Sequence, residues 1–513
     1  MNILRDKFKT YELVGMGLSI LAILLLIITV FLGLNSALST DEGFTFHLMG
    51  MSFQNIVLAT ASDVHPPLYY IVLKCIMNIV SPENSFNIIV GKLFSLVPII
   101  LLIFFSLIKL RKDWGWLASG IFTFCIVTMP RMMFYGIEAR MYSLSIFFVT
   151  LSFYYCYLIT KQANGKNWII FILFSLFAAY THYYCLFAVG FLYILLLYNI
   201  ISKSRNLIKR WLISVIVTVL CYVPWIYLLI NYSKYFSTSQ WIQPTIKDII
   251  LMIGFIFSPI KDVYEFKYLL KSIWTTLFEI FGILLLISFI VLIFTQISKK
   301  NKGKRGPLTF IELGGIFLIF STSIFVIIFS ILIKPMIEPR YLTPFLGCLW
   351  LSFAVLLSKT YSTKKIFTPI LIILILTGFS SSVTLIDFKH YYGESISEFE
   401  NNLNQIDKND TVIFLIYPWA EYFVKYYYHG SNIIIWDYVN PTIIDGEEAS
   451  KKGHIWLYDM GIGVSDIRKG KQIKIGVNTT LVNDGFKLEN VSLLIIPDYY
   501  RYYTSQVYEI KPR

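Results

Sequence analysis

The amino-acid sequence predicts a polytopic α-helical membrane protein with a small α/β domain at its C-terminal end. Hydrophobic residues make up 56% of the 513 residues and charged residues only 15%, whereas roughly a quarter of the residues are charged in soluble domains. Apolar runs of about 20 residues recur along residues 1–386, and each is long enough to cross ~30 Å of hydrocarbon. After residue 386 the apolar runs become short and are bounded by turn residues.

Residues 1–386 are therefore predicted to form one membrane domain of about eleven transmembrane helices. Their approximate limits are 12–34, 88–108, 115–130, 142–160, 167–181, 184–202, 211–230, 272–297, 308–333, 341–358 and 366–386. A closed β-barrel would instead show short segments of alternating hydrophobicity, which are missing from this sequence. The first run is uncharged from Leu13 to Leu34, which exceeds the apolar core of a signal peptide, so we expect a retained anchor.

Residues 387–513 are predicted to form a separate α/β domain. Short apolar runs typical of strands occur at 410–417, 432–438, 454–460 and 491–497. Residues 420–430, between the first two runs, have the length of a helix, and a strand–helix–strand order predicts a partly parallel sheet. This domain carries no recognisable catalytic motif. Acceptor binding, a lid and a purely stabilising cap all remain open roles for it.

The distribution of positive charge predicts which side of the membrane each loop faces. The net charge is +13, and the last domain holds 17 acidic and 13 basic residues, so the membrane domain carries +17. Basic clusters separate the spans at 5–9, 109–112, 161–166, 203–210, 299–305 and 359–365. With the N-terminus in the cytoplasm, all of these clusters face the cytoplasm, as the positive-inside rule requires. Because the charge lies in short loops, it indicates topology and not nucleic-acid binding.

The same orientation brings the unusual polar residues to the extracytoplasmic face, together with the C-terminal domain. The candidate site residues are Asp41, Glu42, Asp63, His65, Glu138, Arg140, His182 and Arg340. Each has a structural alternative as a helix cap, a surface ion pair or part of an interfacial aromatic belt. Pro66 and Pro67, for example, suit the first turn of an interfacial helix with Asp63 near its N-cap. Ionisable residues at membrane depth are nevertheless costly, and they usually mark a functional site.

The residue types on this face suit transfer of a group from a phosphate. A carboxylate can accept the proton of an attacking hydroxyl, and the forked guanidinium of arginine binds phosphate oxygens. The sequence has no Walker A motif, which agrees with a donor that is not a nucleotide. The six cysteines lie in or beside apolar segments and indicate no disulfide framework.

Several segments occur in an order that resembles a known family. They are DEGFT (41–45), DVHPPLYY (63–70), YGIEARMYSL (135–144), AAYTHYY (178–184), WIQPTIKDI (241–249) and EPRYLTPF (338–345). Together they resemble the protein-mannosyltransferase-like enzymes of glycosyltransferase family 39, in the GT-C superfamily, and specifically a bacterial member. The resemblance covers roughly residues 1–350 and leaves out the C-terminal domain.

The resemblance implies transfer of a sugar from a polyprenyl-phosphate-linked donor to an acceptor hydroxyl, with inversion at the anomeric carbon. The acceptor would be a protein or an envelope glycopolymer on the extracytoplasmic face of the cell membrane. The family's catalytic base corresponds to Asp41 and its acidic partner to Glu42, while the family's His-Pro-Pro segment corresponds to residues 65–67. Ile137 stands where the family carries a polar residue.

Two residue roles follow from the chemistry and two points stay open. We expect Arg340, with Arg140 or Lys334, to hold the departing lipid phosphate. Residues 241–244, in the loop 231–271, are the best candidate for a lid on the acceptor side. Members of the superfamily differ in metal use, so a divalent metal among the first-loop carboxylates and imidazole stays open, as do the sugar and the acceptor.

Two further functions compete with the glycosyltransferase. A transporter or lipid flippase would place charged residues near the bilayer midplane, often on repeated halves of the chain. Here the charged residues collect at one face, and no two-fold repeat is visible. An oligosaccharide polymerase or ligase would use nearly the same chemistry with a different acceptor.

Overall fold

A computed structural model of the chain describes residues 2–63, 65–81, 87–232, 245–260, 273–301, 309–333, 336–407, 409–416, 421–428, 433–437, 454–459, 486–497 and 502–512. The chain divides into two compact units. The first unit contains Met1–Leu34 and Met51–Ile386, and the second contains Asn35–Gly50 and Asp387–Arg513. The chain therefore leaves the first unit after its first helix, contributes a short segment to the second unit, and then returns.

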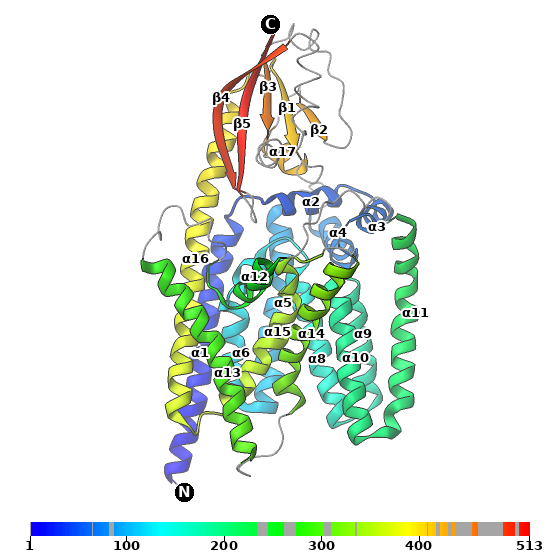
Figure 1. The fold of residues 1–513 in the computed structure, drawn as a ribbon, viewed down its shortest axis with the longest axis vertical. Helices are drawn as coiled ribbons and strands as arrows, with labels where there is room; N and C mark the ends of the chain where they lie inside the picture. Colours follow the sequence, from blue (N-terminus) through cyan, green and yellow to red (C-terminus); the bar gives the residue numbers. More distant parts are fainter. Residues whose placement is uncertain are drawn as a thin grey trace. The chain divides into compact units, whose positions relative to one another are not determined.

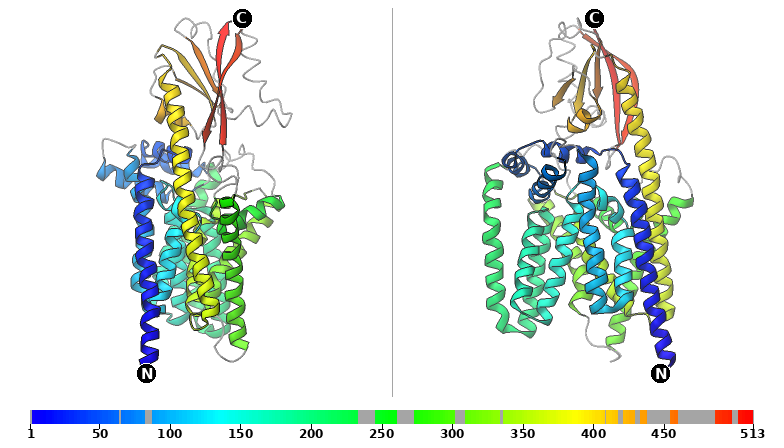
Figure 2. Two further views of the ribbon diagram at one scale, coloured as in Figure 1. Left: turned by 90° about the vertical axis from the view of Figure 1, so that its left-hand side faces the viewer. Right: turned by 180° about the vertical axis from the view of Figure 1, so that it is seen from behind.

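All regular secondary structure in the described residues of the first unit is helical. Its helices are α1 (Asn2–Leu34), α3 (Phe53–Ala61), α4 (Leu68–Val80), α5 (Ile88–Phe105), η1 (Ser106–Leu110), α6 (Arg111–Thr128), α7 (Met132–Ile137), α8 (Tyr142–Lys161), α9 (Gly165–Ala179), α10 (Tyr183–Lys203), η2 (Arg205–Leu207), α11 (Ile208–Tyr232), α12 (Ile246–Phe257), α13 (Ile273–Asn301), α14 (Phe310–Leu332), η4 (Pro339–Phe345), α15 (Leu346–Ser358) and α16 (Lys364–Asn404), which continues into the second unit. The long helices run side by side, with the short helices α3, α4 and α12 toward one end of the bundle (Figures 1 and 2).

Nine helical stretches among the described residues are long and apolar enough to cross a membrane. They match the spans predicted from the sequence, with two differences in how the helices are divided. The stretch Ile88–Thr128 contains two predicted spans, and the predicted span 167–181 is the shorter apolar helix α9. The structure thus confirms a polytopic helical membrane protein.

The stretch Ile88–Thr128 is a hairpin and not one long helix. Gly115 has φ +82°, a left-handed conformation that side chains rarely adopt, and it interrupts the helical backbone there. The hydroxyl of Ser106 donates to the carbonyl of Ser119 at 2.9 Å, and the Thr123 hydroxyl donates to Ser106 at 3.0 Å. In a straight helix residues 106 and 119 would be ~20 Å apart, so the chain must reverse between them.

Small residues allow neighbouring helices to pack closely. A Cβ atom at Gly15 of α1 would overlap the carbonyl of Trp116 on α6, and one at Gly120 would overlap the carbonyl of Gly15. In lipid the hydrophobic effect does not drive helices together. Helices there associate through van der Waals packing, and small residues let their backbones come close enough for it.

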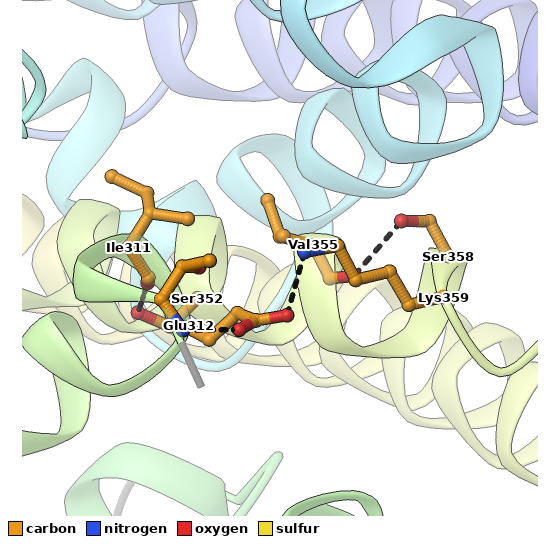
Figure 3. Close-up of polar contacts among 7 residues, drawn as sticks. Ile311, Glu312, Ser352, Val355, Ser358 and Lys359 are labelled. Carbon is orange, nitrogen blue, oxygen red and sulfur yellow. Dashed lines mark hydrogen bonds and ion pairs between the residues drawn. The ribbon is translucent and has the colours of Figure 1, made fainter. Parts of the chain in front are cut away.

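Helices α14 and α15 are joined by a polar clamp at the end of the bundle that carries Lys359 (Figure 3). Lys359 Nζ lies 2.7 Å from Oε1 of Glu312, whose side chain is buried. The Ser352 hydroxyl donates to the carbonyl of Ile311 at 2.6 Å and accepts from the Gly315 amide at 3.0 Å. Glu312 also caps the start of α14 through the Thr309 amide, so this carboxylate has a structural explanation.

The second unit combines a five-stranded sheet with short helices. Its elements are α2 (Thr40–Met49), the end of α16, β1 (Thr411–Ile416), α17 (Glu421–Tyr427), β2 (Ile433–Asp437), β3 (Ile455–Asp459), β4 (Phe486–Pro497) and β5 (Tyr502–Pro512). The strand order is β2-β1-β3-β5-β4. Strand β1 pairs in parallel with β2 and β3, and β5 pairs antiparallel with β3 and β4. This confirms the predicted α/β domain with a partly parallel sheet.

Strand β5 was not predicted from the sequence. Residues 502–512 read YYTSQVYEIKP, in which polar residues are mixed with apolar ones and no purely apolar run occurs. The segment therefore lacks the apolar run that predicted the other strands. Pairing with β3 and β4 on both sides determines this strand.

Candidate functional site

Four separate segments of the first unit bring ring and guanidinium side chains together at one end of the bundle. His65 precedes α4, Arg140 precedes α8, His182 is the N-cap of α10, and Arg340 and Tyr341 lie on η4. The ring centroids of His65 and His182 are 4.9 Å apart, those of His182 and Tyr341 4.9 Å, and those of His65 and Tyr341 5.6 Å. Tyr341 was not among the predicted site residues, although it directly follows Arg340.

Hydrogen bonds between the segments hold this arrangement. The amide of Leu68, at the start of α4, donates to the carbonyl of Tyr180 at 3.1 Å. The Tyr184 hydroxyl donates to the carbonyl of Met336 at 2.7 Å, which ties α10 to the segment before η4. Because the loops before α4, α10 and α15 are linked in this way, their side chains have a defined common geometry.

One of the two ring nitrogens of His182 caps the N-terminus of α10. Its Nδ1 accepts a hydrogen bond from the Tyr184 amide at 3.1 Å, which caps the N-terminus of α10. A neutral imidazole that accepts at Nδ1 carries its proton on Nε2. The Nε2–H group is therefore available as a hydrogen-bond donor.

The electrostatics of the cluster keep both histidines neutral. Burial is the largest cause that lowers the pKa of His65 well below its ordinary value, followed by His182, Arg140 and Arg340. Burial, with the same two arginines, lowers the pKa of His182 to about 3. The guanidinium groups carry the positive charge, and the imidazoles beside them act as neutral polar groups.

Two buried nitrogen atoms in the cluster point to a polar ligand. Among the residues that the structure describes, no hydrogen-bond partner lies at Nδ1 of His65 or Nε2 of His182, although both side chains are 1% exposed. Buried polar atoms are nearly always hydrogen-bonded in folded proteins. These atoms therefore suit a site that binds an oxygen-rich group.

The two arginines sit in different surroundings. Arg140 is buried, with its guanidinium carbon 6.0 Å from the ring centre of Tyr70, and its amide donates to the Glu138 carbonyl at 2.6 Å. Arg340 is partly exposed, and its Nε lies 3.9 Å from Oε1 of Glu338. Glu138 is buried in the same hairpin as Arg140. Arg340 is thus the arginine more accessible from outside the protein.

Arg131 anchors the hairpin that carries Arg140. It has φ +70°, which is rare for a residue with a side chain. Its guanidinium donates to the carbonyl of Ile260 at 2.8 Å and lies 5.3 Å from the ring centre of Phe255 on α12. These contacts explain the strained backbone, because they connect the hairpin to a helix far away in the sequence.

Asp63 does not take up its structural alternative as a helix cap. The residue at the N-cap of α4 is Pro67, which makes no side-chain cap, while the role of Asp63 in substrate binding stays a prediction. The amide of Asp63 donates to the carbonyl of Thr60 at 3.1 Å. Asp63 thus continues the turn that ends α3, because the two prolines delay the start of the next helix.

Asp41 and Glu42 lie on helix α2, in the second unit. The Glu42 carboxylate accepts from the Ser39 amide at 3.0 Å, while the Glu42 amide donates to the Ser39 hydroxyl at 3.2 Å. This is a capping box, which a Ser-x-x-Glu spacing signals in the sequence alone. Glu42 is 2% exposed, whereas Asp41 is only half-buried in the first turn of the helix.

No protein-family model and no curated protein matches the sequence. The structure is similar to that of apo ArnT from Cupriavidus metallidurans, with a TM-score of 0.56 over 96% of this chain and 98% of that chain, at 10% identity. The same enzyme bound to undecaprenyl phosphate gives a TM-score of 0.55 at 11% identity, with the same coverage. The archaeal oligosaccharyltransferase AglB from Archaeoglobus fulgidus, in complex with an inhibitory peptide and a dolichol-phosphate, gives 0.41 over 83% of this chain and 61% of that chain, at 11% identity.

The chain has the GT-C fold. The similarity to ArnT extends over 96% of the chain, well beyond residues 1–350, which carry the sequence resemblance. It therefore takes in the C-terminal part of the chain, which the sequence motifs leave out.

Packing against α1 accounts for the apolar residue at Ile137. The Ile137 side chain is buried, and a Cβ atom at Gly33 of α1 would overlap it. Ile137 therefore fills the space that Gly33 leaves between α1 and α7. A polar side chain at this position would lose that packing.

Some predictions lie outside what the structure describes. Lys334 and residues 241–244 fall outside the described residues. Within the described residues there is no group of three or more histidine, cysteine or acidic side chains that could hold a metal ion. All six cysteines are unpaired thiols.

Proposed function

We propose that this protein is a membrane glycosyltransferase that moves a sugar from a polyprenyl-phosphate-linked donor to an acceptor hydroxyl on the extracytoplasmic face. The observation that carries the proposal is the cluster of Arg140 and Arg340 beside the neutral His65 and His182. Two guanidinium groups with neutral hydrogen-bonding imidazoles suit an anionic phosphate at the membrane surface. The similarity to a protein that binds undecaprenyl phosphate supports the same ligand class.

The location of the cluster favours an enzyme over a transporter. His65 lies three residues before the start of α4, His182 is the N-cap of α10, Arg140 lies two residues before the start of α8, and Arg340 lies in η4 before α15. All of these positions are helix ends, whereas transporters place their charged groups near the bilayer midplane. A site at the end of the bundle suits an acceptor that approaches from outside the membrane.

The proposed reaction assigns a role to each group. Asp41, the residue that the family resemblance implies as base, takes the proton of the acceptor hydroxyl. The hydroxyl oxygen forms a bond to the anomeric carbon while the bond from that carbon to the phosphate oxygen breaks. The phosphate stays on the lipid and gains negative charge, which Arg340 and Arg140 stabilise. Attack opposite to the leaving group inverts the anomeric centre.

The cluster contributes most to the departure of the lipid phosphate. Arg340 is partly exposed, so we expect its guanidinium, whose fork suits phosphate oxygens, to be the first to meet an incoming phosphate. The Nε2–H of His182 adds a neutral donor that needs no change of protonation. A positioned base and a preorganised phosphate site each contribute about 10²-fold or more to a transfer of this kind.

Two measurements test the proposal together. The purified protein is titrated with undecaprenyl phosphate, and cell-envelope glycans are compared by mass spectrometry with and without the gene. We expect saturable binding of the lipid phosphate and the loss of a sugar substituent from one glycan or glycoprotein. Binding without any change in the glycans would favour a lipid flippase, and shortened glycan chains would favour a polymerase or ligase. Absence of both effects would refute the proposal.

A further inference from the structure

The segment that carries Asp41 is built into the C-terminal domain. Helix α2 and residues 35–39 before it belong to the same compact unit as the sheet. Phe46, Leu48 and Met49 of α2 are fully buried. Helix α17, which connects β1 to β2, packs against α2 (Figure 1). This domain, whose role the sequence left open, therefore carries Asp41, the residue that the family resemblance implies as the base.

The hydroxyl of Tyr427 binds the backbone just before the start of α2. The Tyr427 hydroxyl, on α17, accepts from the Leu38 amide at 2.8 Å and lies 3.5 Å from the carbonyl of the same residue. Leu38 is 1% exposed and directly precedes Ser39, the N-cap of α2. Burial raises the pKa of Tyr427 above its ordinary value, so the phenol stays protonated and can both accept and donate.

The contact surface around this hydrogen bond is tight. A Cβ atom at Gly43 would lie 3.0 Å from the amide nitrogen of Phe423, so a side chain there would push the two helices apart by a few tenths of an ångström. The rings of Phe423 and Tyr427 are 5.0 Å apart, and Phe399 of α16 stacks on Phe423 with centroids 6.0 Å apart. The Lys389 ammonium donates to the Ser36 hydroxyl at 3.0 Å. Helix α2 is thus held at its start, at its middle and at the segment before it.

We propose that Tyr427 is a positioning residue for the transfer reaction, which holds the Asp41 helix in its working orientation from the C-terminal domain. The inference rests on the proposed role of Asp41 as base. Asp41 lies three residues after Leu38, within the first turn of the helix that the hydroxyl orients. Displacement of a catalytic group by about 1 Å can lower a rate by about 10²-fold. The C-terminal domain is then part of the catalytic apparatus and not only a cap.

The test compares two neighbouring tyrosines. Tyr427→Phe removes the hydroxyl that binds Leu38. Tyr428→Phe is the matched control, because Tyr428 packs against Phe414 of β1, with ring centroids 5.9 Å apart, on the side of the sheet. For Tyr427→Phe we expect formation of the envelope glycan per folded protein molecule to fall about tenfold or more. The control should stay within about twofold of the parent.

Two readouts separate positioning from a general loss of structure. Undecaprenyl phosphate binding to the purified variant should stay within about twofold of the parent, because the arginine cluster lies in the other unit. Hydrogen exchange of the amides in residues 36–50 should become faster in Tyr427→Phe and stay unchanged in Tyr428→Phe. Gly43→Ala, which presses α2 away from Phe423, should reproduce the loss of transfer with binding retained.

The outcomes distinguish this inference from the function it rests on. Parental transfer in both Tyr427→Phe and Gly43→Ala, while Asp41→Asn is inactive, would overturn the positioning role and leave the proposed function intact. Parental transfer in Asp41→Asn would overturn the assignment of the base, and the positioning role with it.

Discussion

Replacement of Arg340 by alanine is predicted to weaken lipid phosphate binding by about 30-fold. A hydrogen bond to a charged group contributes about 1.5–3 kcal/mol, and loss of about 2 kcal/mol corresponds to about 30-fold in Kd. The ion pair with Glu338 subtracts little from this value, because Nε of Arg340 and Oε1 of Glu338 are 3.9 Å apart, which is too far for a hydrogen bond. Arg340→Ala should therefore show nearly the full loss of the phosphate contact.

Two further variants calibrate this value. Arg340→Lys keeps the charge but not the fork, so we expect a loss of only about fivefold. Glu338→Gln removes the carboxylate beside Arg340 and should tighten binding about twofold. Arg210→Ala serves as the control for loss of positive charge, because Arg210 is exposed and donates to the Ala163 carbonyl, in a loop predicted to face the cytoplasm.

The assay is equilibrium binding of undecaprenyl phosphate to the purified protein in lipid nanodiscs, at fixed ionic strength because surface charge is screened by salt. Thermal unfolding of each variant shows that the fold is retained. If Arg340→Ala and Arg210→Ala bind the lipid phosphate equally well, and as tightly as the parent, Arg340 does not contact the phosphate and our assignment is wrong.

Three further predictions concern topology, the base and pH. In a background without native cysteines, a cysteine at Ser62 should react with an impermeant thiol reagent in intact cells, and one at Ser362 only after lysis; the reverse pattern would invert the predicted orientation. Asp41→Asn should retain undecaprenyl phosphate binding while glycan transfer falls about 10²-fold or more. Asp63→Asn, at the turn after α3, should change binding and transfer together. If Asp63→Asn binds the lipid phosphate but transfers no sugar, and Asp41→Asn stays active, the two roles must be exchanged. The pKa of His182 is about 3 in the folded protein and about 6.5 in an unfolded chain, so the unfolded state binds more protons between these two values. Thermal stability should therefore fall from pH 7 to pH 5. His182→Gln should reduce that fall, and a pH profile of stability that this variant leaves unchanged would contradict the buried neutral state of His182.

The amino-acid sequence by itself determined the membrane spans and the sheet type, because both depend on local patterns. The length of each apolar run sets whether a helix can cross the bilayer, and basic residues in short loops predict the orientation. The same local information predicted that Arg140, His182 and Arg340 lie at helix ends on a common face. Even the reversal at Gly115 was visible as a break between two runs.

The tertiary structure alone decided which of these residues meet. The contact of His65 with His182 and Tyr341, at centroid distances of 4.9 and 5.6 Å, depends on the rotation of each helix about its axis and on hydrogen bonds between loops far apart in sequence. No local pattern encodes either of these. Membership of α2 in the C-terminal unit is the clearest case, because its hydrogen bond joins Leu38 to Tyr427, 389 residues later. A contact of that range results from packing of the whole domain, and only the folded chain shows it.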